Sequence, residues 1–199
     1  MAKNTYKQIT TPVGTAVYPH LRTTERFEGN DSGKYSCSIV LDAAATEKLM
    51  QTIENEWEMA KKTSEFEGKR FARNSTPSLG YTEAENGEIR FKAKTNAVIK
   101  TKTGEILEKT VPIFDAKNKP MAEDVEIGNG SKIRLCMLLR PFYVSSSIYG
   151  VQLLLKAVQV IEYVEPTFGG EVTADSCGFE ADENAEENPF PADANEADF

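Results

Sequence analysis

The sequence predicts a mainly β fold, a small closed barrel with one α-helix, followed by a disordered acidic tail. Apolar and polar residues alternate over most of the first 164 positions, and turn signals separate the alternating segments. Only one segment carries apolar residues at helical spacing. Regularly spaced strands with a single helix favour a closed barrel, because closure removes exposed sheet edges.

The elements are expected in the order strand, strand, helix and then further strands. Asp42 can cap the helix, apolar residues recur at Leu49, Ile53 and Trp57, and we expect the helix to end near Thr63 or Ser64. The strands are expected at 15–22, 34–41, 88–101, 109–115, 132–144 and 148–164. Glycine-, asparagine- and serine-rich turns separate them, as at Glu28–Gly33, Asn86–Gly87, Gly128–Gly130 and Ser145–Ser147.

Charge divides the chain into two parts near residue 170. Of 31 acidic residues, ten lie in 171–199, where there is no Lys or Arg. Residues 1–170 contain the other 21 acidic residues and all 23 Lys and Arg residues, which gives this part a net charge of +2. The tail lacks the apolar residues needed to offset its ordering entropy. We therefore expect a folded domain at 1–170 and a disordered acidic tail at 171–199.

Composition is typical of a globular protein, with 40% hydrophobic and 27% charged residues. No apolar run approaches the ~20 residues of a membrane helix, and the N-terminus lacks the apolar core of a signal peptide. Cys37, Cys136 and Cys177 fit neither a disulfide framework nor a metal site. These features predict a cytoplasmic protein without a membrane partner.

The segment 88–102 carries the clearest functional pattern. Ile89, Phe91, Ala93, Thr95, Ala97 and Ile99 form one expected core face, while Arg90, Lys92, Lys94, Asn96, Lys100 and Lys102 point the other way. Five bases on one face repel each other unless an anion spans them, and a phosphate backbone does so. For this stripe alone, an ordinary solvated strand face remains the alternative.

Two other segments repeat the alternation. In the first, Arg134 and Arg140 alternate with the apolar residues Ile133, Leu135, Met137 and Leu139. In the second, Tyr18, His20 and Arg22 alternate with Val17, Pro19 and Leu21. Aromatic residues flank two turns, with Phe27 and Tyr35 at the first and Phe142, Tyr143 and Tyr149 at the second. Aromatic side chains stack on nucleobases, and Lys and Arg side chains neutralise phosphates. Single-strand binding requires both. Each ring taken singly is more often part of a core.

Enzyme signatures are missing from the sequence. It has no phosphate-binding glycine loop, dinucleotide fingerprint or zinc spacing, and its single histidine is His20. We therefore expect neither an enzyme nor a cofactor. Two alternatives stay open: an interaction or inhibitor module whose acidic tail mimics DNA, and, with less support, a nuclease of the barrel type.

Several short motifs, in order along almost the whole chain, resemble the bacteriophage single-stranded DNA-binding proteins with an OB fold and an acidic tail ending in Phe. They are Met1-Ala2-Lys3, Gly14-Thr15-Ala16, Met121 to Val125, Gly130-Ser131-Lys132, Thr167 to Gly170 and Ala197-Asp198-Phe199. The resemblance implies a five-stranded OB-fold barrel with an inserted helix. It also implies strand protection and annealing during phage replication and recombination in an infected bacterial cell.

The resemblance further implies roles for single residues. The family's N-terminal basic residue corresponds to Lys3, whereas Lys34 replaces a basic residue that has no direct match. The terminal Asp198 and Phe199 are expected to recruit replication proteins such as DNA polymerase, and the tail to compete with DNA and support a homodimer. The tail is less densely acidic than a continuous Asp/Glu run, so its competition would be weaker. The expected DNA-binding residues are Lys3, Tyr18, Arg22, Lys34, Tyr35, Arg90, Lys92, Lys94, Lys100, Arg134, Arg140, Phe142, Tyr143 and Tyr149.

Overall fold

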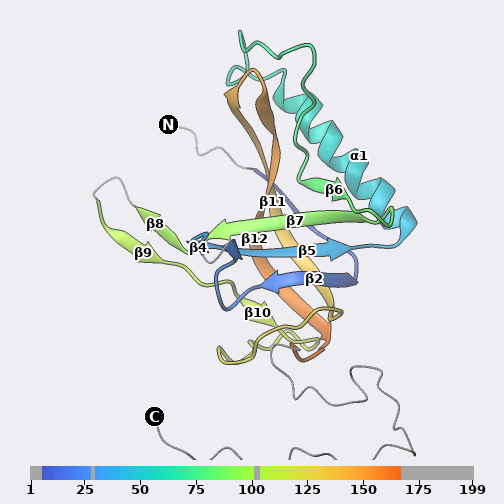
Figure 1. The fold of residues 1–199 in the computed structure, drawn as a ribbon, viewed down its shortest axis with the longest axis vertical. Helices are drawn as coiled ribbons and strands as arrows, with labels where there is room; N and C mark the ends of the chain where they lie inside the picture. The colour runs from blue at the N-terminus through green and yellow to red at the C-terminus, as the bar shows by residue number, and fades with distance from the viewer. Residues whose placement is uncertain (1–5, 28–29, 101–103, 167–199) are drawn as a thin grey trace, which may run out of the picture. The chain divides into compact units, whose positions relative to one another are not determined.

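Five strands close into a barrel in the computed structural model, which describes residues 6–27, 30–100 and 104–166 (Figure 1). They are β2 (Gly14–His20), β5 (Lys34–Val40), β7 (Ile89–Asn96), β11 (Lys132–Ser145) and β12 (Ile148–Glu162). Around the ring, β2 is followed by β5, β7, β12 and β11, which returns to β2. The expected five-stranded OB-fold barrel is confirmed.

The ring is completed by two short pairings. Lys94 of β7 lies opposite Leu154 of β12 in parallel register, and Thr15 of β2 lies opposite Lys132 of β11. The core inside the ring comes from the alternate residues that the sequence assigns to it. Phe91, Ala93 and Thr95 of β7 are buried, as are Ile133, Leu135, Met137 and Leu139 of β11. The alternation of these two strands is therefore confirmed.

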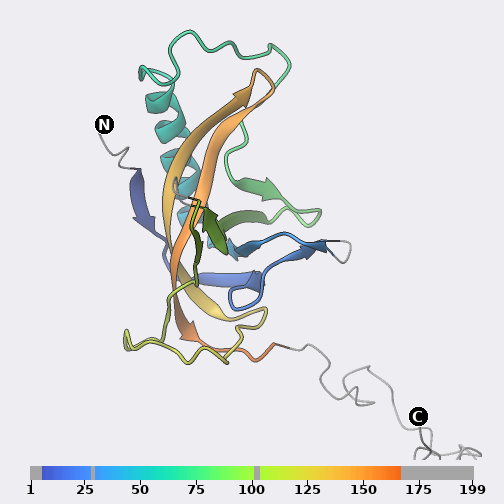
Figure 2. The ribbon, with the colours of Figure 1, turned by 90° about the vertical axis from the view of Figure 1, so that its left-hand side faces the viewer.

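The strands β11 and β12 extend beyond the barrel as a two-stranded arm. Figure 2 shows the helix α1 (Ala43–Ala60) along one side of this arm and β2, β5 and β7 on the other. Asp42 caps the helix, since its Oδ1 accepts a hydrogen bond of 2.8 Å from the Ala45 N–H. The helix ends at Ala60, three residues before the expected end, and turns follow it.

An aromatic cluster joins α1 and the following loop to the arm. Trp57 stacks on Tyr149 with ring centroids 5.5 Å apart, and Phe66 meets Trp57 edge-on. Phe71 contacts both Tyr149 and Tyr143 edge-on, with centroids 4.7 and 5.8 Å apart. Such contacts add to the free energy gained from burial, so the loop after α1 is held firmly against the arm.

Short strands complete the fold. They are β1 (Lys7–Thr10) on β11, β6 (Tyr81–Glu83) on β7, β10 (Ile113–Phe114) on β12, and two separate hairpins, β3 (Arg26–Phe27) with β4 (Asn30–Asp31) and β8 (Val98–Lys100) with β9 (Ile106–Glu108). The β8–β9 hairpin projects from the barrel (Figure 1). The sequence analysis missed β1, β3, β4, β6 and β9. Each of these strands has only two to four residues, which is too short for a recognisable alternation of apolar and polar side chains.

Three expected strands differ from the structure. The segment 88–101 divides at Ala97, whose N–H donates to the Gly33 carbonyl, so Ile99 is exposed on β8 rather than part of the core. The segment 109–115 forms a strand only at 113–114. An irregularity between Val17 and His20 breaks the alternation of β2, so that Ala16 and Leu21 are buried and Val17 and Pro19 are not.

Candidate nucleic-acid interface

The outer face of β5 and β7 carries the basic stripe. Lys92 lies opposite Ser38 and Lys94 opposite Ser36, so small hydroxyl side chains separate the lysines from β2. Lys34 lies opposite Asn96 on the same face. The alternation of the sequence therefore places Lys34, Lys92 and Lys94 together outside the barrel, above a core of Phe91 and Ala93.

A groove of about 560 Å³ runs between this face and the arm. It is lined by Tyr18, Ser38, Ser78, Gly80, Tyr81, Thr82, Arg90, Lys92, Lys94, Phe142, Val151, Gln152 and Leu153. Five residues that the sequence analysis selected, from three separate segments, line it together: Tyr18, Arg90, Lys92, Lys94 and Phe142. The groove thus combines three cations with three aromatic rings, since Tyr81 of β6 also lines it.

The lysines of the groove influence one another. The pKa of Lys94 is lowered, first by burial and then by the charges of Lys34 and Lys92. A nearby like charge disfavours the protonated form of an amine, and a bound anion would favour it. The groove therefore holds positive charge at a free-energy cost that an anionic ligand removes.

Glu25 partly neutralises the stripe. It forms an ion pair with Lys92, and its Oε2 accepts a hydrogen bond of 3.1 Å from Ser36. Burial opposes ionisation of Glu25, but the contacts with Lys92, Ser36 and His20 outweigh it, and its pKa is lowered. Glu25 is thus a carboxylate at neutral pH, and any anion that enters the groove has to compete with it for Lys92.

Tyr18 presents its ring from a constrained backbone. The residue has a φ of 48°, in the left-handed region that non-glycine residues rarely adopt, and its side chain is exposed by 62%. Its N–H donates to Oδ1 of Asn129 over 2.6 Å. Strain of this kind persists only where surrounding contacts hold it, and it concentrates at functional sites.

Arg90 extends the cationic lining. Its Nη2 lies 3.2 Å from Oε2 of Glu88, so one side of the guanidinium is neutralised. Within the described part of the chain, its buried Nε has no hydrogen-bond partner. A buried donor without an acceptor raises the free energy of the empty groove.

Other expected DNA-binding residues have structural contacts instead. Arg22 donates to the carbonyls of Val125, Met121 and Ala122 and holds that loop. Tyr149 is only 5% exposed and stacks on Trp57, so its ring has no free face. Tyr143 packs on Phe71 and donates its hydroxyl proton to the Arg70 carbonyl. We leave these three out of the interface for these reasons.

The remaining candidates fall into three groups. By register Arg140 faces Gln152 and shares its face with Phe142, which places it at the rim of the groove. Tyr35 packs against the core, Lys100 lies on the β8–β9 hairpin, and Arg134 donates to Gln159 Oε1, so none of them lines the groove. Lys3, Asp198 and Phe199 lie outside the described residues.

Residues 13–163 match the sequence model of a family described as "Single-stranded DNA-binding protein, Bacteriophage T7". The chain belongs to this family. It is a family of DNA-binding proteins, in agreement with the expectation that the chain is not an enzyme.

Two solved structures of phage single-stranded DNA-binding proteins share the fold. The chain is 22% identical to gp2.5 of bacteriophage T7, with a TM-score of 0.65 over 92% of this chain and 98% of that one. It is 13% identical to the protein of bacteriophage Enc34, solved in complex with single-stranded DNA, with a TM-score of 0.58 over 81% and 89% of the two chains. No curated protein sequence matches the chain.

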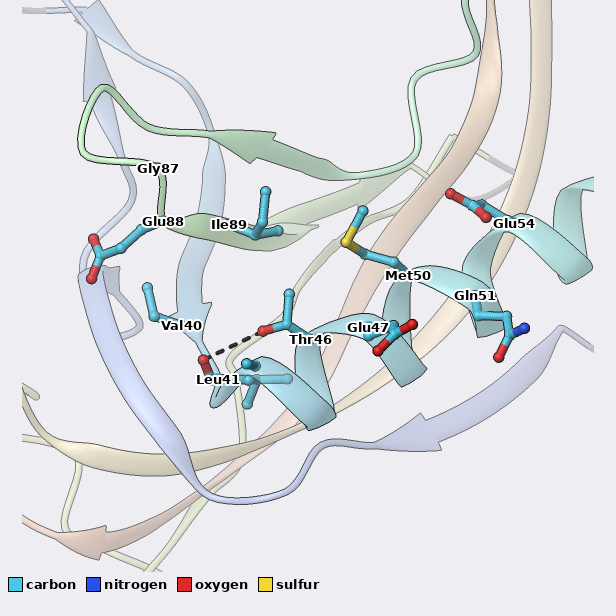
Figure 3. Close-up of a pocket in the computed structure, with 11 residues that line it drawn as sticks. Val40, Leu41, Thr46, Glu47, Met50, Gln51, Glu54, Gly87, Glu88 and Ile89 are labelled. Atoms are coloured by element: carbon cyan, nitrogen blue, oxygen red, sulfur yellow. Dashed lines mark hydrogen bonds between the residues drawn. The ribbon is translucent and has the colours of Figure 1, made fainter.

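A second hollow, of about 620 Å³, lies between α1, the end of β5 and the turn before β7 (Figure 3). Among the lining residues, Thr46 donates its hydroxyl proton to the Leu41 carbonyl over 3.3 Å. Glu47, Glu54 and Glu88 line the hollow and would repel phosphates, so this family member is not expected to bind DNA there.

Metal ligands and membrane-spanning helices were sought among residues 6–27, 30–100 and 104–166. No group of three or more His, Cys, Asp or Glu residues is arranged to hold a metal ion there. None of the helices among these residues combines the length and apolarity that crossing a bilayer requires.

The sequence analysis of this phage-type domain missed several residues in the groove or beside it. Glu25 contacts Lys92 and Ser36 only through the arrangement of distant segments, and no local pattern signals these contacts. Gln152 looked like an ordinary outward-facing strand residue, and Tyr81 lies in a segment that was not expected to form a strand. For Asn129 the signal was its turn, Gly128–Gly130, which the sequence analysis treated only as a separator.

Proposed function

We propose that the groove between β7 and the arm holds one DNA strand, without sequence preference. Lys34, Lys92, Lys94 and Arg90 neutralise phosphates, while Tyr18 and Phe142 stack on bases. The observation that carries the proposal is the convergence, in one groove, of Lys92 and Lys94 with two aromatic rings from distant segments. A duplex hides its base faces, so this combination favours a single strand.

The family membership supports a wider role. We propose that the protein coats, protects and anneals single strands during phage replication and recombination, in the cytoplasm of the infected bacterial cell. We further propose that residues 171–199 form a disordered tail that competes with DNA for the groove. In this proposal Asp198 and Phe199 recruit replication proteins such as DNA polymerase, and the tail supports a homodimer.

Fluorescence anisotropy with labelled oligo-dT and a matched duplex tests the groove. The full-length protein should prefer the single strand, and its affinity should fall with salt. Lys92→Ala with Lys94→Ala should bind more weakly and reduce the salt slope by about 1.4, since each phosphate contact on a single strand contributes about 0.7.

The matched control replaces two exposed lysines far from the groove, Lys48 on α1 and Lys117 after β10. This control should bind like the unaltered protein. Equal binding of duplex and single strand, or equal losses in both variants, would contradict the proposal and favour an interaction module whose tail mimics DNA.

A further inference from the structure

The free end of the arm exposes two large apolar side chains. Val144 is 71% exposed and Ile148 is 56% exposed, whereas their neighbour Tyr149 is buried. Arg140 and Phe142 of β11 share one face with Gln152, Gly150 and Ile148 of β12, and Val144 lies at an irregularity of β11 next to the turn. This face therefore continues from the groove, which Phe142 and Gln152 line, to the end of the arm.

A basic loop lies against the same end of the arm. Lys69, Arg70 and Arg73 are exposed, and none of them takes part in the ion pairs found among the described residues. Lys69 lies over the ring of Tyr143, with its Nζ 4.9 Å from the ring centroid. We call Lys69, Arg70, Arg73, Val144 and Ile148 the arm-tip patch.

Backbone contacts fix this loop to the arm. The Ala72 N–H donates to the Ser146 carbonyl over 2.9 Å, between Arg70 and Arg73 in the chain. The Arg70 carbonyl accepts the Tyr143 hydroxyl over 2.9 Å. Phe71 packs edge-on against Tyr143 and Tyr149, which anchors the loop further. The three cations are consequently presented by a rigid support, which lowers the entropic cost of binding an anion.

The loop leads directly into the groove. The Ser78 N–H donates to the Tyr149 carbonyl and the Ser78 carbonyl accepts from the Val151 N–H, so this segment runs along β12. Ser78 and Gly80 then line the groove. Only four residues separate Arg73 from Ser78, a span of at most about 18 Å. Both views show the chain descending beside the arm to β6 (Figures 1 and 2).

We infer that the bound DNA strand leaves the groove along the arm and is held a second time at the arm-tip patch. Lys69, Arg70 and Arg73 contact phosphates there, and Val144 and Ile148 contact the apolar faces of bases. This inference rests on the proposed function of the groove and extends the site by several nucleotides. Exposed apolar and cationic side chains at the same end of the arm suit a single strand, whose bases are exposed between phosphates.

A length series tests the inference. Oligo-dT of about 6 to about 24 nucleotides is titrated with full-length protein, since single barrels of this type cover about 4–16 nucleotides. The affinity of the unaltered protein should rise until an oligonucleotide reaches the patch. The triple variant Lys69→Ala, Arg70→Ala, Arg73→Ala should match it on the shortest strands and bind the longest ones about tenfold more weakly. Its salt slope on long strands should fall by about 2.

Two further variants make the result specific. Lys48→Ala, Lys117→Ala, Lys119→Ala removes the same charge elsewhere and should leave the length dependence unchanged. Val144→Ser with Ile148→Ser should weaken binding only to long strands. If the triple variant follows the unaltered protein at every length, the inference is wrong while the groove stands. If the Lys92→Ala, Lys94→Ala variant also binds normally, the proposed function itself fails.

Discussion

The side chain of Asn129 holds the backbone of Tyr18, because its Oδ1 accepts the Tyr18 N–H over 2.6 Å. The contact joins the turn before β11 to the irregular part of β2, 111 residues earlier in the chain. It fixes a residue with a φ of 48° whose ring lines the groove. The groove is thus built around an aromatic side chain in a strained backbone conformation.

Tyr18→Ala should weaken single-strand binding by about 1–3 kcal/mol, the usual contribution of one stacked base. Tyr18→Gly should lose the same affinity but be about 1 kcal/mol more stable than Tyr18→Ala, because glycine adopts the left-handed conformation without strain. Anisotropy titrations and thermal unfolding measure the two effects. Full affinity in Tyr18→Gly would show that the ring does not contact DNA.

Lys94→Met should bind single strands about tenfold more weakly and yet unfold at a higher temperature at pH 7. The pKa of Lys94 is lowered in the folded protein, so folding disfavours the protonated amine and its charge costs stability at neutral pH. That cost disappears as the pH rises through the lowered pKa. The difference in unfolding temperature between the variant and the unaltered protein should therefore shrink towards pH 10. Lys48→Met is the control, and a stabilisation of the same size there would contradict the explanation.

Glu25→Gln should strengthen single-strand binding by up to about fivefold, since an exposed ion pair contributes up to about 1 kcal/mol and DNA no longer competes for Lys92. The same variant should be less stable at neutral pH. The folded-state pKa of Glu25 is lowered, so its contribution is present above the unfolded-state pKa and is lost as the pH falls through the folded-state pKa. Unfolding in acid should therefore differ less between variant and unaltered protein. Unchanged affinity would show that the pair does not compete with DNA.

Removal of residues 171–199 should strengthen binding to oligo-dT, most clearly at low salt. A tethered polyanion has a high effective concentration near the groove, and its loss frees the lysines for DNA. Titration of full-length protein and of residues 1–170 at two salt concentrations measures this. Replacing the ten tail acids by their amides keeps the length and should reproduce the gain. Equal or weaker binding by the shortened chain would contradict the competition.

The alternation of apolar and polar residues predicted the barrel and the basic face of β7. In β7 and β11 this alternation places Phe91 and Met137 in the core and Lys92 outside it. The groove itself could be predicted only in part. Tyr18 and Phe142 were selected as single aromatics, but their meeting with Lys94 depends on how the ring closes, which local pattern does not encode.

Three of the selected side chains have contacts within the domain that the sequence did not reveal. Tyr149 and Tyr143 were expected at the DNA because they flank a turn, yet the turn lies at the end of an arm packed against α1, so both rings are used in packing. Arg22 was expected to meet phosphates, but three backbone carbonyls bind it. In each case a tertiary contact that is distant in sequence determines the role of the side chain.

Closure of the ring between Lys94 and Leu154 also determines when the groove forms during synthesis of the chain. The β12 strand, which ends at Glu162, supplies one wall of the groove and the last pairing of the barrel. A nascent chain that has emerged from the ribosome only as far as β7 carries its lysines on an incomplete sheet, with Phe142 and Gln152 still to be added. The chain therefore acquires its binding groove only after almost the entire domain has been translated.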